Sequence, residues 1–332
     1  MRFFTFKGLL LTTIFMLLGC LSIQAEDDDL ITKQVTVKLD EAGTLPDKIG
    51  SAKKYKITNL KIIGEINGTD WRMIRDMAGR NVSHDETEGN LSELDLSDAS
   101  IVPGGDYYIT CAYFGYPSKI HTSHQVIGDL AFEGCSGLIS LKLPSDIRLI
   151  GRHAFEGCSG LTSITLPSGV TEIGSSAFYG CSGLTSITLP SGVTWIGHSA
   201  FEGCSGLTSI TLPSGVTEIG KSAFANCSGL TSIYVYAEKM PKLRTNMFDG
   251  CDAKKCTVYV PKGTYDDYWL SEFGYFENIV EFDPTGINNV ITSNDAKELS
   301  RYSVNGQRLS APTKGLNIVK YSDGSVKKVA VQ

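Results

Sequence analysis

The sequence predicts a β-rich solenoid, in which short coils of chain stack on one another around a shared core. Two observations carry this prediction. An Ile-Gly pair recurs every 23 residues, at Ile127, Ile150, Ile173, Ile196 and Ile219. The nineteen residues from Glu156 to Gly174 return from Glu202 to Gly220, with a close copy between them. Fixed periods of about 20–50 residues are typical of solenoids, because one coil cannot bury its own apolar face.

Each coil is expected to contain one short strand. The pattern L-x-x-L-x-L directs three aliphatic side chains toward the core and leaves the residues between them on an exposed face. A proline then ends each strand, because it has no N–H for the strand ladder. The aliphatic triplets are Leu161, Ile164 and Leu166, then Leu184, Ile187 and Leu189, then Leu207, Ile210 and Leu212, and the prolines are Pro167, Pro190 and Pro213.

The rest of the repeat supplies the opposite side of the coil. Val170 and Ile173 are apolar, and one aromatic position recurs as Phe132, Phe155, Phe178, Phe201, Phe224 and Phe248. We interpret these phenylalanines as a column in the core. The glycine before the cysteine in "GCSG" predicts a tight turn with a positive φ angle, which glycine adopts without strain.

The unit "IGxxAFxGCSGLTSITLPSGVTE" resembles the leucine-rich repeats of BspA-like bacterial surface proteins, from about Ile127 to Pro261. The segment Leu91–Ile101 reads as a divergent copy, with Leu91, Leu94 and Leu96 in the strand positions. Residues before it resemble an N-terminal cap, with a strand at Leu60–Ile62 and a short helix from Asp70 to Met77, capped by Thr69 or Asp70. Cys256–Asp283 resembles the closing strand and aromatic helix of such arrays, with Trp269 and Phe276 as the expected plug.

The resemblance implies a leucine-rich repeat solenoid: a right-handed superhelix of stacked coils with a parallel β-sheet on one face and an α/β N-terminal cap. We divide the chain into a signal peptide (1–25), an N-terminal cap (26–90), a repeat array (91–262), a C-terminal cap (263–284) and a C-terminal β tail (285–332). In the tail, "NG" and "DG" turns between alternating segments predict a small β-hairpin module. It also resembles tails that act as sorting signals on some exported proteins.

The first 25 residues are typical of an export signal, with Arg2 and Lys7 before an apolar run from Leu9 to Leu18. The run is too short to span a membrane, which takes about 20 residues. Cleavage after Ala25 would give a secreted chain. Alternatively, "LLGC" resembles a lipobox, in which Cys20 becomes the lipidated N-terminus. Both routes predict an exported protein, either secreted or held at the bacterial cell surface on the outer membrane.

Six of the nine cysteines occupy equivalent repeat positions: Cys135, Cys158, Cys181, Cys204, Cys227 and Cys251. Equivalent residues on adjacent coils lie about 4.8 Å apart with parallel side chains, whereas a disulfide requires two sulfurs that turn toward each other. We therefore predict a column of buried, unpaired thiols. Cys251 and Cys256 are the pair best placed to form a bond.

Metal and catalytic sites find little support in the sequence. Cys111, His121 and His124 are three potential zinc ligands, but no fourth has suitable spacing, so we interpret this insertion as a surface loop. His153 and His198 replace serine or lysine of other coils, and we expect both to be exposed. The serines recur in every coil, whereas a nucleophile is needed once beside a base. We predict no enzyme activity, metal or cofactor, and the net charge of −6 argues against a nucleic-acid partner.

The exposed strand face is therefore the candidate binding surface. Its hydroxyls are Thr162, Thr165, Thr185, Thr188, Thr208 and Thr211, and the face changes at Lys142 on one side and at Tyr234 and Tyr236 on the other. Tyrosine is favoured as a binding anchor. The resemblance implies protein binding or adhesion, with a host extracellular-matrix or other cell-surface protein as partner. A glycan-binding or structural cell-envelope module is the alternative. It is also consistent with the sequence that the face binds nothing, in which case the hydroxyls keep the sheet soluble and the tyrosines cover the last coils.

Overall fold

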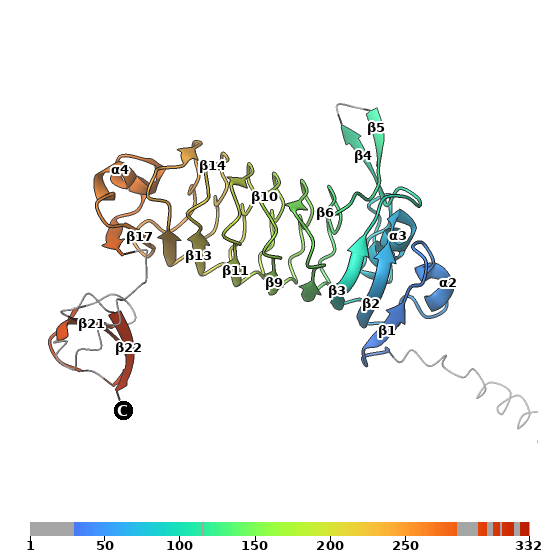
Figure 1. Cartoon of the computed structure of the whole chain (residues 1–332), viewed down its shortest axis with the longest axis horizontal. Coiled ribbons are helices and arrows are strands. Elements are labelled where there is room, and N and C mark those ends of the chain that lie inside the picture. The colour runs from blue at the N-terminus through green and yellow to red at the C-terminus, as the bar shows by residue number, and fades with distance from the viewer. Residues whose placement is uncertain are drawn as a thin grey trace, which may run out of the picture. The chain divides into compact units, whose positions relative to one another are not determined.

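The computed structural model describes residues 30–113, 116–283, 298–303, 308–312, 314–321 and 326–331. The chain divides into two compact units, residues 1–281 and 282–332. The first unit is the expected solenoid of 23-residue coils, with a ten-stranded sheet along one side and a six-stranded sheet along another (Figure 1). The export signal, Cys20 and both cleavage sites lie outside the described residues.

The large sheet contains one strand from each coil. Every strand from β1 to β17 in it pairs in parallel with the next, and equivalent residues align, as in Ile164, Ile187 and Ile210. Its strands, in spatial order, are β1 (Val35–Lys38), β2 (Asn59–Ile66), β3 (Glu93–Ile101), β7 (Ser140–Lys142), β9 (Ser163–Thr165), β11 (Ser186–Thr188), β13 (Ser209–Leu212), β15 (Ser232–Val235), β17 (Thr257–Pro261) and β18 (Asn278–Phe282).

The small sheet contains the Ile-Gly positions of the repeat. Its parallel strands have two residues each, so the coil needs only a brief extended segment on this side. The strands are β6 (Val126–Ile127), β8 (Leu149–Ile150), β10 (Glu172–Ile173), β12 (Trp195–Ile196), β14 (Glu218–Ile219) and β16 (Lys242–Leu243).

Between the sheets, the recurring phenylalanines form the predicted core column. Neighbouring rings from Phe132 to Phe248 stack with centroids 5.1–5.9 Å apart, and all six side chains are buried. All eight cysteines of the described residues are free, Cys251 and Cys256 included. Each repeat thiol from Cys158 to Cys251 donates to the phenylalanine carbonyl oxygen of the preceding coil, at 3.1–3.3 Å. The thiols therefore pack as apolar residues and also link adjacent coils.

The turn before each cysteine has the predicted backbone conformation. Gly134, Gly157, Gly180 and Gly203 have φ between 68° and 75°, and Asn226 takes this position in the next coil with φ 58°. A second left-handed position recurs at His153 (φ 54°), where the other coils have Leu130, Ser176, Ser199 and Ser222. His153 was expected to be exposed, but it is half-buried at this position, as is Leu130.

The N-terminal cap begins the array with α2 (Leu45–Ile49) and α3 (Gly68–Met77) beside β1 and β2. Helix α3 starts earlier than the sequence suggested. Its capping residue is Asn67, whose side chain accepts from the Thr69 N–H, while Asp70 accepts from the Asn67 N–H in a reciprocal capping box. Trp71 and the fully buried Arg75 both donate to the Ala131 carbonyl oxygen, which fastens the cap to the first regular coil.

One predicted loop and one predicted plug residue need correction. The insertion around Cys111 is a β-hairpin, β4 (Ile109–Tyr113) and β5 (Tyr116–Ile120), because its extended segments pair in antiparallel register. At the other end, α4 (Tyr265–Trp269) and the 3₁₀ helix η1 (Glu272–Tyr275) close the array. Phe276 is buried as expected, but Trp269 is 45% exposed, and Tyr268 and Phe273 fill the core instead.

The second unit is an antiparallel sheet with strand order β20 (Arg308–Leu309), β19 (Glu298–Ser303), β21 (Gly315–Tyr321) and β22 (Val326–Val331). It contains the expected hairpin, β21–β22, and two further strands. The "NG" and "DG" turns themselves lie outside the described residues. Among the helices in the described parts of the chain, none has the length and apolar composition to cross a membrane.

Candidate functional site

The outward face of the large sheet carries two columns of threonine with different roles. Thr162, Thr185 and Thr208 are exposed, yet each donates its hydroxyl to the backbone carbonyl of the coil before it, at 3.2–3.3 Å. These three hydroxyls therefore stabilise the stack and are poorer ligand donors than the sequence suggested. Thr165 and Thr188 lie in register on β9 and β11 and are exposed.

A matching ladder follows the small sheet. Thr171, Thr194 and Thr217 each donate to the carbonyl of the preceding coil, at 3.0–3.4 Å. In the sequence, Thr162, Thr185 and Thr208 were predicted to be outward threonines of the same kind as Thr165, Thr188 and Thr211. The distinguishing signal is position, since a structural threonine stands next to a strand and an outward one within it. Of the six candidate threonines, the three that lie within strands, Thr165, Thr188 and the half-exposed Thr211, therefore stay candidates for contact with a ligand.

Tyrosines replace threonine where the large sheet approaches its C-terminal end. Tyr234 follows Thr211 in register, and Tyr259 of β17 follows Tyr234. The Tyr234 and Tyr259 rings are parallel within 7°, with centroids 4.6 Å apart. Partial burial raises the pKa of the Tyr259 hydroxyl, with a smaller contribution from Tyr234. Tyr236 lies two residues beyond Tyr234 and is half-buried.

Tyr259 is a site residue that the sequence analysis missed. It lies in "TVYVP", which repeats the "SIYV" pattern of Tyr234 with the tyrosine in the same outward place. Recognising that alignment would have predicted the pair, because equivalent outward residues on neighbouring parallel strands are direct neighbours.

Lys142, at the other end of the regular face, forms an ion pair with Asp95 of β3, with Nζ 2.9 Å from Oδ2. Burial alone would raise the pKa of Asp95, but hydrogen bonds from Ser97 and the charge and hydrogen bond of Lys142 lower it to about 2. Lys142 therefore has a structural partner. It connects the divergent strand β3 to the first regular coil.

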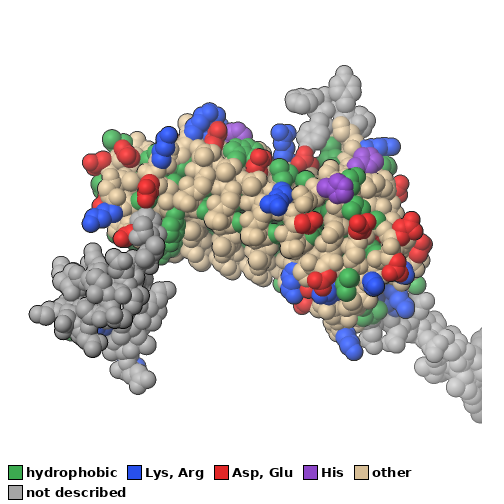
Figure 2. Space-filling view, in the orientation of Figure 1, with side chains coloured by type: hydrophobic (Ala, Val, Ile, Leu, Met, Phe, Trp, Pro, Cys, Tyr) green, Lys and Arg blue, Asp and Glu red, His purple; other side chains and the backbone are tan. Residues whose placement is uncertain are grey.

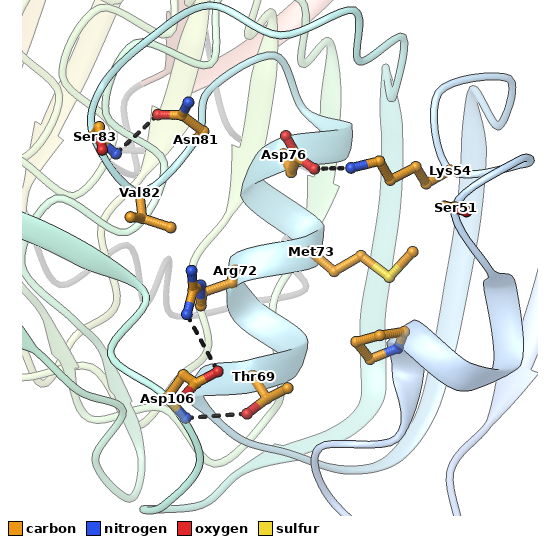
Figure 3. A pocket seen from close by; sticks show the side chains of 11 residues that line it. Ser51, Lys54, Thr69, Arg72, Met73, Asp76, Asn81, Val82, Ser83 and Asp106 are labelled. Carbon is orange, nitrogen blue, oxygen red and sulfur yellow. Dashed lines mark hydrogen bonds and ion pairs between the residues drawn. The ribbon is translucent and has the colours of Figure 1, made fainter.

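The N-terminal cap contains a cleft of about 690 Å³ that the sequence did not predict. It lies along α3, whose Thr69, Arg72, Met73 and Asp76 line it (Figure 3). Arg72 pairs with Asp106 at 3.2 Å and Lys54 with Asp76, one ion pair on each side of the helix. Because its charged groups already have partners inside the chain, the cleft carries no concentrated charge.

The histidines do not form a metal site within the described residues. No group of three or more His, Cys, Asp or Glu side chains is placed to hold an ion in that part of the chain. His121 and His124 are exposed, and the ring of His121 lies 6.4 Å from that of Tyr107. His153 contacts Glu156, which raises the pKa of His153 although partial burial opposes this. His198 is exposed, as expected, and accepts from the Lys221 N–H.

These features define a class: a leucine-rich repeat solenoid with capped ends and an outward face of small hydroxyls and tyrosines. Residues 125–255 match the model of the BspA type leucine rich repeat region, in six copies. This segment is therefore a BspA-type leucine-rich repeat region, as its repeat unit indicated.

Solved structures of bacterial leucine-rich repeat proteins are similar to part of the chain. One from Bacteroides ovatus is 36% identical over 46% of this chain and 38% of its own, with a TM-score of 0.37. One from T. pallidum is 30% identical over 48% of this chain and 66% of its own, with a TM-score of 0.34. A leucine rich cell surface protein from Faecalibacterium prausnitzii is 22% identical over 65% of this chain and 51% of its own, with a TM-score of 0.30.

The chain thus spans less than two thirds of the length of each of these three structures. A search of curated proteins found no match.

Proposed function

We propose that the chain is an exported, non-enzymatic protein that binds other proteins through the outward face of the large sheet. The partners proposed are host extracellular-matrix proteins or proteins on other cells, which would make the chain an adhesion protein. The observation that carries this proposal is the outward face itself, which is nearly uncharged over β9, β11 and β13 and then ends in the stacked Tyr234–Tyr259 pair. The BspA-type repeat region supports the same class of function.

The tyrosine pair is suited to anchor a protein partner. A tyrosine offers a large contact area with only two side-chain torsions to fix, and its hydroxyl keeps a polar tip. The stacked rings also hold each other in place, so little conformational freedom is lost on binding. Beside them, Thr211 is much smaller, and Tyr234 therefore forms a step against which a partner side chain can pack.

Binding can be tested with beads coated with the mature chain and with purified collagen, laminin and fibronectin as probes. We expect at least one probe to bind, and the double change Tyr234→Ser and Tyr259→Ser to weaken it about tenfold, as for a central interface anchor. Tyr179→Ser is the matched control, because Tyr179 is 40% exposed on a turn away from this pair. The proposal fails if no probe binds, or if the double variant binds as well as the control.

Export is supported by the sequence of residues 1–25, with two processing routes. Mass spectrometry of the mature N-terminus separates them. A lipidated Cys20 would indicate a membrane-anchored surface protein, whereas an N-terminal Glu26 would indicate a secreted one. An unprocessed Met1 in exported material would contradict both.

Glycan binding is the second candidate, and the tyrosine pair beside the outward threonines is what favours it. Sugar rings present C–H groups that pack on aromatic faces, while threonine hydroxyls can exchange hydrogen bonds with sugar hydroxyls. A glycan array probed with the mature chain tests this candidate. A signal that is lost in the tyrosine double variant would support it, and a signal no higher than background would exclude it.

A further inference from the structure

The C-terminal cap has two faces of opposite character. Its inner face closes the phenylalanine column, with Phe273 and Phe276 packed on Phe248 at 5.2 and 4.8 Å between ring centroids. Its outer face leaves three large apolar side chains open: Tyr265, Trp269 and Leu270 are 38%, 45% and 84% exposed. The outer face of a solenoid cap is expected to be polar for solubility. Neighbouring exposed apolar groups with a polar surround instead mark an interaction site.

The aromatic residues of this face are held in a fixed arrangement. Tyr265 and Trp269 are one helical turn apart on α4, which places them on the same side of the helix. Their rings are parallel within 7°, with centroids 6.1 Å apart. The start of α4 is fixed by Glu281 of β18, whose carboxylate accepts from the Gly263 and Tyr265 N–H groups at 2.8 and 3.1 Å.

The segment that contains these rings is acidic. Within the first unit, the segment from Lys262 to Glu281 contains five acidic residues and one basic residue, Lys262, and the basic Lys254 and Lys255 precede it. By comparison, the regular coils from Leu161 to Thr217 contain two acidic residues and no basic one. Figure 2 shows acidic side chains, and basic ones as well, near hydrophobic ones at the end of the solenoid where Figure 1 places α4. The acidic residues are Asp266, Asp267, Glu272, Glu277 and Glu281.

We propose that this outer face of the C-terminal cap binds a basic polypeptide segment in which arginine or lysine alternates with apolar residues. An arginine guanidinium can stack on Tyr265 or Trp269 and pair with the exposed carboxylates of Asp266 and Asp267. The apolar residues of the segment pack on Leu270. A neutral glycan would use the two rings but would gain little from the carboxylates or the leucine, so the charge pattern favours a cationic peptide.

The proposed site and the tyrosine pair of the sheet face consist of different residues, so variants can test the two one at a time. The probe is a short fluorescent peptide that alternates arginine with leucine, added to the full mature chain and followed by fluorescence anisotropy. The control peptide has glutamate in place of every arginine. We expect binding of the arginine peptide only, weakened at high salt because exposed charges are screened.

Two variants test the two parts of the site. Trp269→Ser removes a ring, and we expect about tenfold weaker binding, as for an interface aromatic. Asp266→Asn with Asp267→Asn leaves the size of the side chains unchanged, and we expect weaker binding whose remaining part depends less on salt. Tyr179→Ser is the matched control for loss of an exposed aromatic side chain and should bind normally.

Three results would overturn the proposal: equal binding of the glutamate peptide, equal binding by Trp269→Ser and Tyr179→Ser, or unchanged salt dependence in the double asparagine variant. Binding of a neutral oligosaccharide at Trp269 without binding of the arginine peptide would also overturn it, and would assign the face to glycans. Thermal unfolding of each variant checks that the cap remains folded, which is expected because the buried Tyr268, Phe273 and Phe276 are unchanged.

Discussion

Removing one ring from the middle of the phenylalanine column should cost a large part of the stability of the solenoid. Phe178 is fully buried, with its ring stacked 5.1 Å from that of Phe155 and 5.2 Å from that of Phe201. Truncating a buried phenylalanine to alanine costs about 3–5 kcal/mol, because the transfer free energy is lost and a cavity remains. The upper part of this range is expected here, since two ring pairs worth about 0.5–1.5 kcal/mol each are lost together.

The adjacent residue provides the control. Tyr179 follows Phe178 in the same turn and is 40% exposed, so Tyr179→Ala should change the free energy of unfolding by less than about 0.5 kcal/mol. Phe178→Leu should fall between the two, because it keeps apolar volume and loses the ring pairs. The comparison separates burial of volume from stacking.

Urea denaturation followed by far-UV circular dichroism and tryptophan fluorescence measures these values. Trp71 reports on the N-terminal cap, and Trp195 lies on β12, in the coil after Phe178. If unfolding is cooperative along the array, the urea midpoints from circular dichroism and from tryptophan fluorescence should shift by the same amount in Phe178→Ala. A loss below about 1 kcal/mol, or a loss equal to that of Tyr179→Ala, would refute the role of the column as the core.

Three further predictions concern the thiols, an ion pair and a helix cap. A thiol reagent should label Cys111 in the native chain and reach the seven buried cysteines only after denaturation, and native labelling of all eight would contradict their burial. Lys142→Ala should lower the free energy of unfolding by about 1 kcal/mol at neutral pH and by progressively less as the pH falls from about 4 toward 2. The reason is that the folded pKa of Asp95 lies below its unfolded value of about 3.9. An equal loss at neutral pH and at the acid end of this range, measured by urea denaturation, would contradict this. Asn67→Ala should lower the free energy of unfolding by about 1 kcal/mol in thermal unfolding. Asn67→Ser should lower it by less, because serine keeps a side-chain oxygen that can accept from the Thr69 N–H, and equal losses in the two variants would contradict a role for this acceptor.

The repeat made the array predictable from the sequence, because every coil carries the same packing information. A position such as that of Phe178 recurs six times, so a single pattern determines a whole column of the core. The parts that occur once were predicted less well. The insertion at Cys111 was taken for a loop and is a hairpin, since it occurs once and no other coil repeats the pattern of its two strands. Trp269 was expected to be a plug because its segment resembles the closing cap of such arrays, yet in α4 it is Tyr268 that is buried instead.

The candidate site was only partly predictable, for a related reason. Periodicity located the outward face and Tyr234, but a pattern within one strand does not reveal the neighbour across the sheet, so Tyr259 was missed. Likewise, the hydroxyls of Thr162 and Thr165 look equivalent in the sequence. The structure shows that Thr162 donates to the preceding coil. The cleft beside α3 depends on segments distant in the sequence, Lys54 and Asp106 among them, which no local pattern brings together.

Packing between coils restricts where binding specificity can lie in this chain. A residue such as Cys181 or Thr185 bonds to the coil before it, so packing between neighbouring coils restricts which residues these positions can hold. Identical coils present identical surfaces, and an interface built only from them would bind a partner equally well in several registers. A single register requires features that occur once. Two such features are the Tyr234–Tyr259 pair and the aromatic face of α4, both near the C-terminal end of the array. If both proposals hold, a partner that reaches from one to the other would be bound in one direction along the solenoid.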